Sequence, residues 1–286
     1  MDSQLNKILD LIKKKDLVTA KELCYQAKGL ENNFHFQNTF GYLLYEFGEI
    51  KEAIKKWQST VKMNPKYFYA YSNLGNAFEK IGEFNKAVQN FNKAIKIKPD
   101  YFEAYYGLGN VQFKMFKLED ALSNLDKAIQ LRPSYLPALK SKVMLLTKMN
   151  RNQEALQLLN ILISSNLADA ELLFSKGQLL SDLGRKNEAI TSYKNTYLLD
   201  QDFPNILGYL VEAKLDNFEW KNIDQEFEEI KKKLTKQEEV CPPLIISYFC
   251  DSPELQNIAA KIANKKNNKK KTRDFNFDKE KKTINV

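Results

Sequence analysis

Residues 68–101, FYAYSNLGNAFEKIGEFNKAVQNFNKAIKIKPDY, hold the pattern that decides the fold. Apolar residues recur at helical spacing up to Ile81 and again from Phe84, and Gly82 interrupts them. This spacing predicts two amphipathic helices joined by a tight turn. Pro99 is expected to end the second helix, because proline has no amide hydrogen to donate and its ring clashes with the preceding turn.

The same features return every 34 residues on both sides of this stretch. Small residues and prolines mark the period at Ala53, Ala87, Ala121, Ala155 and Ala189, at Gly41, Gly75, Gly109 and Gly177, and at Pro65, Pro99 and Pro133. Facing helices are expected to approach closely at the small residues, where a bulky side chain would overpack the contact. A further series at the same period predicts the turns, near Gly48, Gly82, Phe116, Asn150 and Gly184.

This period divides the chain into helical hairpins. Five repeats are expected at residues 34–67, 68–101, 102–135, 136–169 and 170–203. Residues 1–33 are interpreted as a degenerate first repeat and residues 204–236 as a divergent last one. Residues 237–263 are then expected to form a helical linker, and residues 264–286 a basic tail with the possible start of a following domain.

The second repeat resembles the tetratricopeptide repeat, whose pattern is a bulky residue, Leu-Gly, an aromatic residue, Ala, an aromatic residue, Ala and Pro. These positions are occupied here by Tyr71, Leu74, Gly75, Phe78, Ala87, Phe91, Ala94 and Pro99. The resemblance implies an all-α, right-handed solenoid of stacked hairpins with a concave surface that binds proteins.

In that family the first helix of each repeat lines the groove, chiefly through its second, fifth, sixth, ninth and twelfth residues. The resemblance therefore implies partner-binding residues at Asn38, Tyr42, Tyr45, Tyr69, Ser72, Asn73, Asn76, Glu79, Tyr106, Asn110 and Phe113. An asparagine amide offers both donors and an acceptor to a peptide backbone. We therefore expect Asn73, Asn76 and Asn110 to hold an extended peptide or protein segment.

The charge distribution argues against nucleic acid as a partner. The net charge is +8, but residues 261–286 hold ten Lys and Arg against three Asp and Glu, so +7 belongs to the tail. A nucleic-acid-binding surface needs a basic face that neutralises several phosphates. The nearly neutral body of the chain offers no such excess, so we expect no binding of nucleic acid.

Membrane, metal and catalytic signatures are also missing from the sequence. The most apolar run, Cys241–Cys250, is far shorter than the roughly 20 residues that span a bilayer, and no signal-peptide pattern is present, so we expect a cytoplasmic protein without membrane contact. Cys24, Cys241 and Cys250 have no metal-ligand spacing and are expected to be core residues. His35 is expected at a helix surface. We therefore expect no metal, no cofactor and no catalytic residue within this chain.

The pattern changes after the last repeat. A proline-led apolar segment begins at Pro242, and Ser252-Pro253-Glu254 has the composition of a helix start. That helix is expected to carry Leu255, Ile258, Ala259 and Ile262 on one face. The like-charged run Asn264–Lys271 is expected to be a mobile, solvated linker.

This order is similar to that of the bacterial O-linked N-acetylglucosaminyltransferases and their SPINDLY-like relatives. In that family a divergent repeat with an acidic-aromatic pair, here Phe218-Glu219-Trp220, precedes a basic linker and a nucleotide-sugar-binding lobe, whose first strand would begin at Thr283. The resemblance implies that this chain recruits substrates for a protein O-glycosyltransferase whose catalytic residues follow Val286. The alternative is a stand-alone adaptor or scaffold. The partner and the oligomeric state do not follow from the sequence.

Overall fold

The computed structural model describes residues 3–165, 169–236, 238–247 and 250–272, and within 265–272 it describes the backbone only. Its residues fold into helices, and no strand occurs in these ranges. The predicted all-α repeat fold is confirmed. The chain divides into two compact units, and the boundary between them falls within one helix, between Leu145 and Leu146.

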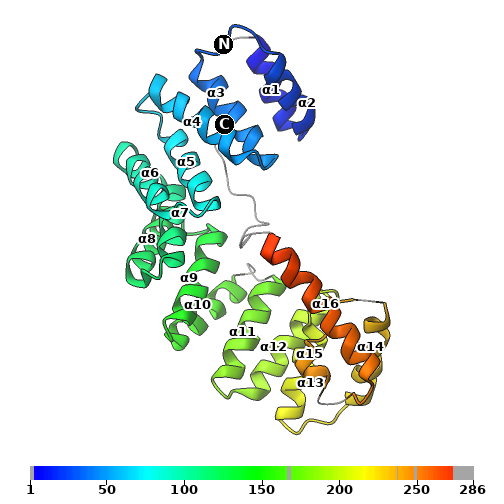
Figure 1. Ribbon diagram of the computed structural model, residues 1–286. Coiled ribbons are helices and arrows are strands. Elements are labelled where there is room, and N and C mark those ends of the chain that lie inside the picture. Colours follow the sequence, from blue (N-terminus) through cyan, green and yellow to red (C-terminus); the bar gives the residue numbers. More distant parts are fainter. Residues whose placement is uncertain (1–2, 166–168, 237, 248–249, 273–286) are drawn as a thin grey trace. The chain divides into compact units, whose positions relative to one another are not determined.

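The first unit consists of helical hairpins (Figure 1). Its helices are α1 (Ser3–Lys13), α2 (Leu17–Gln26), α3 (Phe34–Glu46), α4 (Ile50–Met63), α5 (Phe68–Lys80), α6 (Phe84–Ile97), α7 (Phe102–Lys114), α8 (Leu118–Leu131) and the first part of α9 (Leu136–Lys148). Helices α3 and α4, α5 and α6, and α7 and α8 pack as pairs. The first helices α3, α5 and α7 also contact one another in sequence order, so they share one face of the unit.

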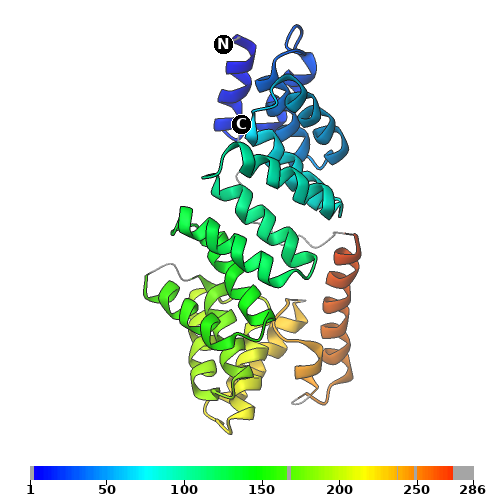
Figure 2. The ribbon, with the colours of Figure 1, turned by 90° about the vertical axis from the view of Figure 1, so that its left-hand side faces the viewer.

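The second unit continues the hairpins and ends in a different arrangement. It contains α10 (Asn152–Ser164), α11 (Ala170–Asp182), α12 (Lys186–Leu199), α13 (Ile206–Asp216), α14 (Ile223–Thr235), α15 (Pro243–Ile246) and α16 (Pro253–Thr272). Helices α11 and α12 pack as a pair, and α16 packs against α14 and α15 (Figure 2). Leu255, Ala259 and Ile262 anchor α16 in an apolar cluster with Ile230 and Ile246.

The turns inside the hairpins have left-handed backbone conformation at the predicted positions. Gly48, Gly82 and Gly184 have φ between 71° and 80°, and Phe116 and Asn150 have φ of 59° and 58°. Glycine adopts this conformation without steric penalty, whereas phenylalanine is strained there. The 34-residue period therefore predicts the turn even where the residue type does not favour it.

Glycines and aromatic rings interlock the helices. A Cβ atom built on Gly75 would lie 2.7 Å from the Phe91 ring, and one on Gly41 would lie 2.7 Å from the Trp57 ring. Both rings are fully buried. The glycine on the first helix therefore makes room for an aromatic ring of the second.

Helix α16 extends further than the sequence indicates. The predicted linker at Asn264–Lys271 belongs to this helix, which ends at Thr272. The segment contains no glycine or proline to stop the helix, and lysine is a good helix former. The predicted strand at Thr283–Val286 lies outside the described residues.

Leucine in place of Ala87 is expected to lower the free energy of unfolding by about 1 to 3 kcal/mol, because Ala87 is fully buried between helices. Urea unfolding measures this change. Gln89→Leu is the matched control on the exposed face of α6, with an expected change within about 0.5 kcal/mol. Equal stability of Ala87→Leu and the unmodified chain would contradict this register of the repeats.

Candidate binding face of the first unit

The eleven predicted partner-binding residues all lie on α3, α5 and α7, the three first helices that contact one another. None of them is highly exposed. Seven are buried, namely Asn38, Tyr45, Ser72, Asn73, Asn76, Glu79 and Tyr106. Four are half-buried, namely Tyr42, Tyr69, Asn110 and Phe113. We call this set the first-helix face.

Asn73 is occupied within the protein. Its side-chain amide donates a 3.2 Å hydrogen bond to Oδ1 of Asn38, and both residues are at most 1% exposed. Asn38 also accepts, through its backbone oxygen, a 3.2 Å hydrogen bond from Nε1 of Trp57. Asn73 therefore connects two neighbouring repeats through one amide hydrogen, and its role as a ligand contact stays a prediction.

Two lysines link consecutive repeats across the same face. Nζ of Lys114 lies 2.9 Å from Oε1 of Glu79, whose side chain is 2% exposed. Nζ of Lys80 lies 4.4 Å from the ring centre of Tyr45. Each lysine is the thirteenth residue of its repeat, and each contacts the twelfth residue of the repeat before it. These lysines are absent from the predicted set, although their 34-residue spacing is a visible signal in the sequence.

Asn76 and Asn110 differ from Asn73. Each is the ninth residue of its repeat, and neither side-chain amide has a hydrogen-bond partner among the described residues. Tyr42 is the ninth residue of the preceding repeat and is half-buried. Burial, and secondarily the charge of Glu46, raise the pKa of Tyr42, so its hydroxyl stays protonated. Hydrogen-bonding groups are therefore available at the same position of three successive repeats.

Aromatic rings lie along the start of the first helices. The ring centres of Tyr67 and Tyr69 are 5.5 Å apart, and those of Tyr69 and Tyr101 are 5.6 Å apart with an interplanar angle of 88°. Such edge-to-face pairs are favourable because the ring edge is positive and the ring face negative. Burial raises the pKa of Tyr67 to about 12. Tyr69 therefore belongs to a preorganised aromatic row.

Glu103, the second residue of its repeat, has a buried Oε2 atom without a hydrogen-bond partner in the described part of the chain. Burial raises the pKa of this carboxyl group, while a backbone hydrogen bond and Arg132 oppose the shift. The folded state therefore binds the proton more tightly than the unfolded state, and ionisation near pH 7 destabilises the fold.

Glu103→Gln is consequently expected to raise the melting temperature at pH 7. The gain should shrink as the pH falls through the raised pKa toward pH 4, where the carboxyl group of the unmodified protein also becomes neutral. Thermal unfolding at both pH values measures this. Equal melting temperatures at pH 7 would contradict the assignment of an unfavourable buried charge.

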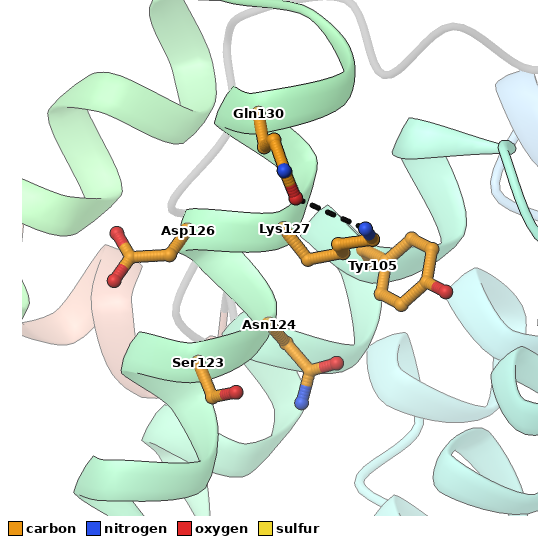
Figure 3. Close-up of a pocket in the computed structure, with 6 residues that line it drawn as sticks. All are labelled: Tyr105, Ser123, Asn124, Asp126, Lys127 and Gln130. Atoms are coloured by element: carbon orange, nitrogen blue, oxygen red, sulfur yellow. Dashed lines mark hydrogen bonds between the residues drawn. The ribbon is translucent and has the colours of Figure 1, made fainter.

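A separate depression lies on α7 and α8 (Figure 3). It is lined by Tyr105, Ser123, Asn124, Asp126, Lys127 and Gln130. Lys127 donates a 3.0 Å hydrogen bond to Gln130, and Asp126 lies 2.7 Å from Lys142. None of the predicted partner-binding residues lines this depression, and its charged groups are paired with neighbours.

The three cysteines and the single histidine lie in different surroundings. Cys24, Cys241 and Cys250 are buried, as the sequence predicts, and burial raises the pKa of Cys24 and of Cys241 to about 12. A nucleophilic cysteine needs the opposite shift. His35 is exposed at the start of α3, with its ring 4.1 Å from that of Phe34.

Hairpins of 34 residues with adjacent first helices define a helical repeat protein. Tetratricopeptide-repeat family models match residues 41–82, 80–115, 102–135 and 170–203, described as "TPR repeat" for the first two ranges and "Tetratricopeptide repeat" for the others. The chain therefore contains tetratricopeptide repeats within residues 41–135 and 170–203.

Solved structures of this class share the fold. A tetratricopeptide repeat protein from Parabacteroides merdae has a TM-score of 0.61 and 19% identity, over 91% of this chain and 98% of that one. PilF of Pseudomonas aeruginosa has a TM-score of 0.62 and 16% identity, over 75% and 96%. YrrB, described as a TPR protein with an unusual peptide-binding site, has a TM-score of 0.52 and 18% identity, over 72% and 97%.

Comparison with curated proteins finds no match to this chain. Within the described ranges, no helix combines the length and the apolar character needed to cross a membrane.

Proposed function

We propose that the first-helix face of the first unit binds an extended segment of a protein partner, with Asn76 and Asn110 as the principal contacts to the partner's backbone. The proposal rests on the hydrogen bonding of these two side-chain amides. Asn73 is bonded to Asn38, whereas Asn76, which is 8% exposed, and Asn110 have no partner among the described residues. Neither amide is among the fully buried polar atoms without a partner in the described ranges, so both reach the surface, where a ligand can bind them.

The chemistry of asparagine suits an extended backbone. Its carbonyl oxygen accepts from a peptide N–H and its amino group donates to a peptide carbonyl, so one side chain satisfies both groups of a residue. Such contacts involve the partner's backbone and do not depend on its side chains. Successive asparagines at the ninth position of neighbouring repeats therefore favour recognition of conformation over sequence.

Half-buried rings supply apolar contact beside these amides. Tyr42, Tyr69 and Phe113 belong to the same face and retain part of their surface. Aromatic side chains offer a large contact area for a small loss of rotamer freedom, which is why they are common binding anchors. YrrB, which shares the fold, is described as having a peptide-binding site, and this supports a peptide as the ligand class.

The test uses a peptide selected against the full chain from a random phage-displayed library. The double variant Asn76→Ala/Asn110→Ala is expected to weaken its binding on the order of tenfold or more, because each hydrogen bond contributes about 0.5 to 1.5 kcal/mol. Asn73→Ala is the matched control. It should lower stability while leaving peptide affinity within about twofold, since its amide is used inside the protein.

Fluorescence anisotropy measures affinity and thermal unfolding measures stability. If the double variant bound the peptide as tightly as the unmodified chain, these amides would not be the binding contacts. A loss of affinity in Asn73→Ala equal to that of the double variant would point to a general structural effect instead.

Recruitment of substrates for a protein O-glycosyltransferase is the more specific interpretation. It rests on the sequence order after residue 204, and the succession of α13 and α14, then α15 from Pro243 and α16, supports that order. The family-model matches end at residue 203 and do not bear on it. We expect a longer protein that contains this chain to have transferase activity. Removal of residues 1–203 should then abolish transfer to protein acceptors. A stand-alone adaptor would show neither.

A further inference from the structure

Three aromatic residues meet in the second unit, at the junction of α11, α12 and α13. The ring centres of Phe174 and Tyr209 are 5.0 Å apart, and those of Phe174 and Tyr193 are 5.8 Å apart. Tyr193 and Tyr209 stack at 6.1 Å with an interplanar angle of 29°. Phe174 and Tyr209 are the fifth and sixth residues of their repeats, so they lie at groove positions of consecutive repeats.

Carboxylates follow these rings along the same helix faces. Glu212 and Asp216 lie three and seven residues after Tyr209, and Asp182 lies eight residues after Phe174. These spacings return to one side of a helix. We call the set Phe174, Tyr193, Tyr209, Asp182, Glu212 and Asp216 the aromatic-acidic cluster.

The carboxylates of this cluster are not neutralised within the protein. Asp182, Glu212 and Asp216 have no ion pair and no hydrogen bond to their carboxylate oxygens among the described residues. Lys186, the nearby cation, donates instead to the backbone oxygen of Asp216 at 2.7 Å. Burial, and secondarily the like charge of Asp216, raise the pKa of Glu212. The free protein therefore keeps a half-buried carboxylate in an unfavourable environment.

Tyr193 provides an independent sign of a missing partner. It is only 3% exposed, yet its hydroxyl has no hydrogen-bond partner in the described ranges. Burial raises the pKa of Tyr193, and Tyr209, Glu212 and Asp182 raise it further. The Tyr193 oxygen is not among the fully buried polar atoms without a partner in the described ranges, so the hydroxyl reaches the surface, where a ligand can bind it.

We propose that the aromatic-acidic cluster is a subsite for a basic side chain, preferentially arginine, of a protein segment bound at α11 and α13 of the second unit. This proposal extends the proposed function to the second unit and names the chemistry of the partner. A guanidinium group has five donors for carboxylate and hydroxyl oxygens, and its plane stacks on aromatic rings. It also neutralises the repulsion between Glu212 and Asp216, which lie at the unfavourable i, i+4 spacing.

A structural role and a ligand-binding role of Glu212 predict opposite effects of Glu212→Gln on stability. If Glu212 served the fold, its replacement by glutamine would destabilise the protein. If it serves a ligand, Glu212→Gln should leave the melting temperature at pH 7 unchanged or raise it, because a desolvated and unpaired charge is removed.

The binding test titrates the full chain with fluorescein-labelled nona-arginine, nona-lysine and nona-glutamate peptides at about 150 mM salt, where exposed charges are screened beyond roughly 8 Å. Nona-arginine is expected to bind more tightly than nona-lysine, and nona-glutamate not at all. Glu212→Gln and Asp182→Asn are each expected to weaken nona-arginine binding on the order of tenfold. Glu228→Gln, which removes the same charge from an exposed position of α14, is the control and should change affinity less than about twofold.

Two outcomes would overturn the subsite. One is the absence of nona-arginine binding, and the other is an equal effect of Glu212→Gln and Glu228→Gln, which would indicate non-specific attraction. The proposed function is tested separately, because the selected peptide and Asn76→Ala/Asn110→Ala report on the first unit. Retained sensitivity to those asparagines with no arginine binding would contradict the subsite alone.

Discussion

Phe91→Ala is expected to lower the free energy of unfolding by about 3 to 5 kcal/mol, the range for removing a buried aromatic ring. The Phe91 ring is fully buried between two repeats. A Cβ atom built on Gly75 of α5 would lie 2.7 Å from the ring, and one on Gly107 of α7 would lie 2.4 Å from it. The ring therefore fills the space beside both helices, and alanine leaves a cavity that neither glycine can fill.

Urea unfolding followed by circular dichroism measures this loss. Phe116→Ala is the matched control, because it removes the same ring from a turn position that is 75% exposed, and its expected change is within about 0.5 kcal/mol. If the two variants lost similar stability, Phe91 would not be the contact that joins α5 to α7.

Lys214→Ala is expected to destabilise the second unit by about 3 to 5 kcal/mol, the range for breaking a buried ion pair. The Lys214 side chain is 3% exposed, and its Nζ lies 2.5 Å from Oε1 of Glu226 and 3.1 Å from the backbone oxygen of Lys221. Oε2 of Glu226 is already buried without a partner in the described structure. Loss of the lysine therefore leaves an uncompensated carboxylate between α13 and α14.

Replacing both partners separates charge from packing. Lys214→Met/Glu226→Leu should recover most of the stability lost in Lys214→Ala, because an apolar pair of similar volume carries no desolvation penalty. Thermal unfolding of the two variants gives the comparison. If the double variant were as unstable as Lys214→Ala, the ion pair would contribute more to stability than the mutual neutralisation of its two charges.

Periodicity alone was sufficient to predict the helices and turns of the five repeats between residues 34 and 203. The first helices of the five repeats begin at Phe34, Phe68, Phe102, Leu136 and Ala170, 34 residues apart. Phe116 adopts the left-handed turn conformation because its neighbours dictate the hairpin, whereas Asn150 is a residue type that tolerates this conformation. Because five copies of the repeat stand in one sequence, the residue types at each repeat position can be compared within that sequence.

Partners of individual side chains could not be predicted in the same way. The period places Asn73 and Asn76 on one helix face, but the bond from Asn73 to Asn38 depends on the distance between repeats. The burial of Lys214 depends on the path of the following loop, which returns the Lys221 carbonyl oxygen to it. Helix α16 continues past Asn264 because nothing in the local sequence stops it, although like charges indicated a linker.

The most direct measurement of the central claim uses the side-chain amide resonances of asparagine in a selectively 15N-labelled chain titrated with the selected peptide. The resonances of Asn76 and Asn110 should shift on binding, whereas those of Asn73, bonded to Asn38, and of Asn90, bonded to the Lys86 carbonyl oxygen on α6, should stay in place. Unchanged resonances of Asn76 and Asn110 at peptide saturation would contradict binding at the first-helix face.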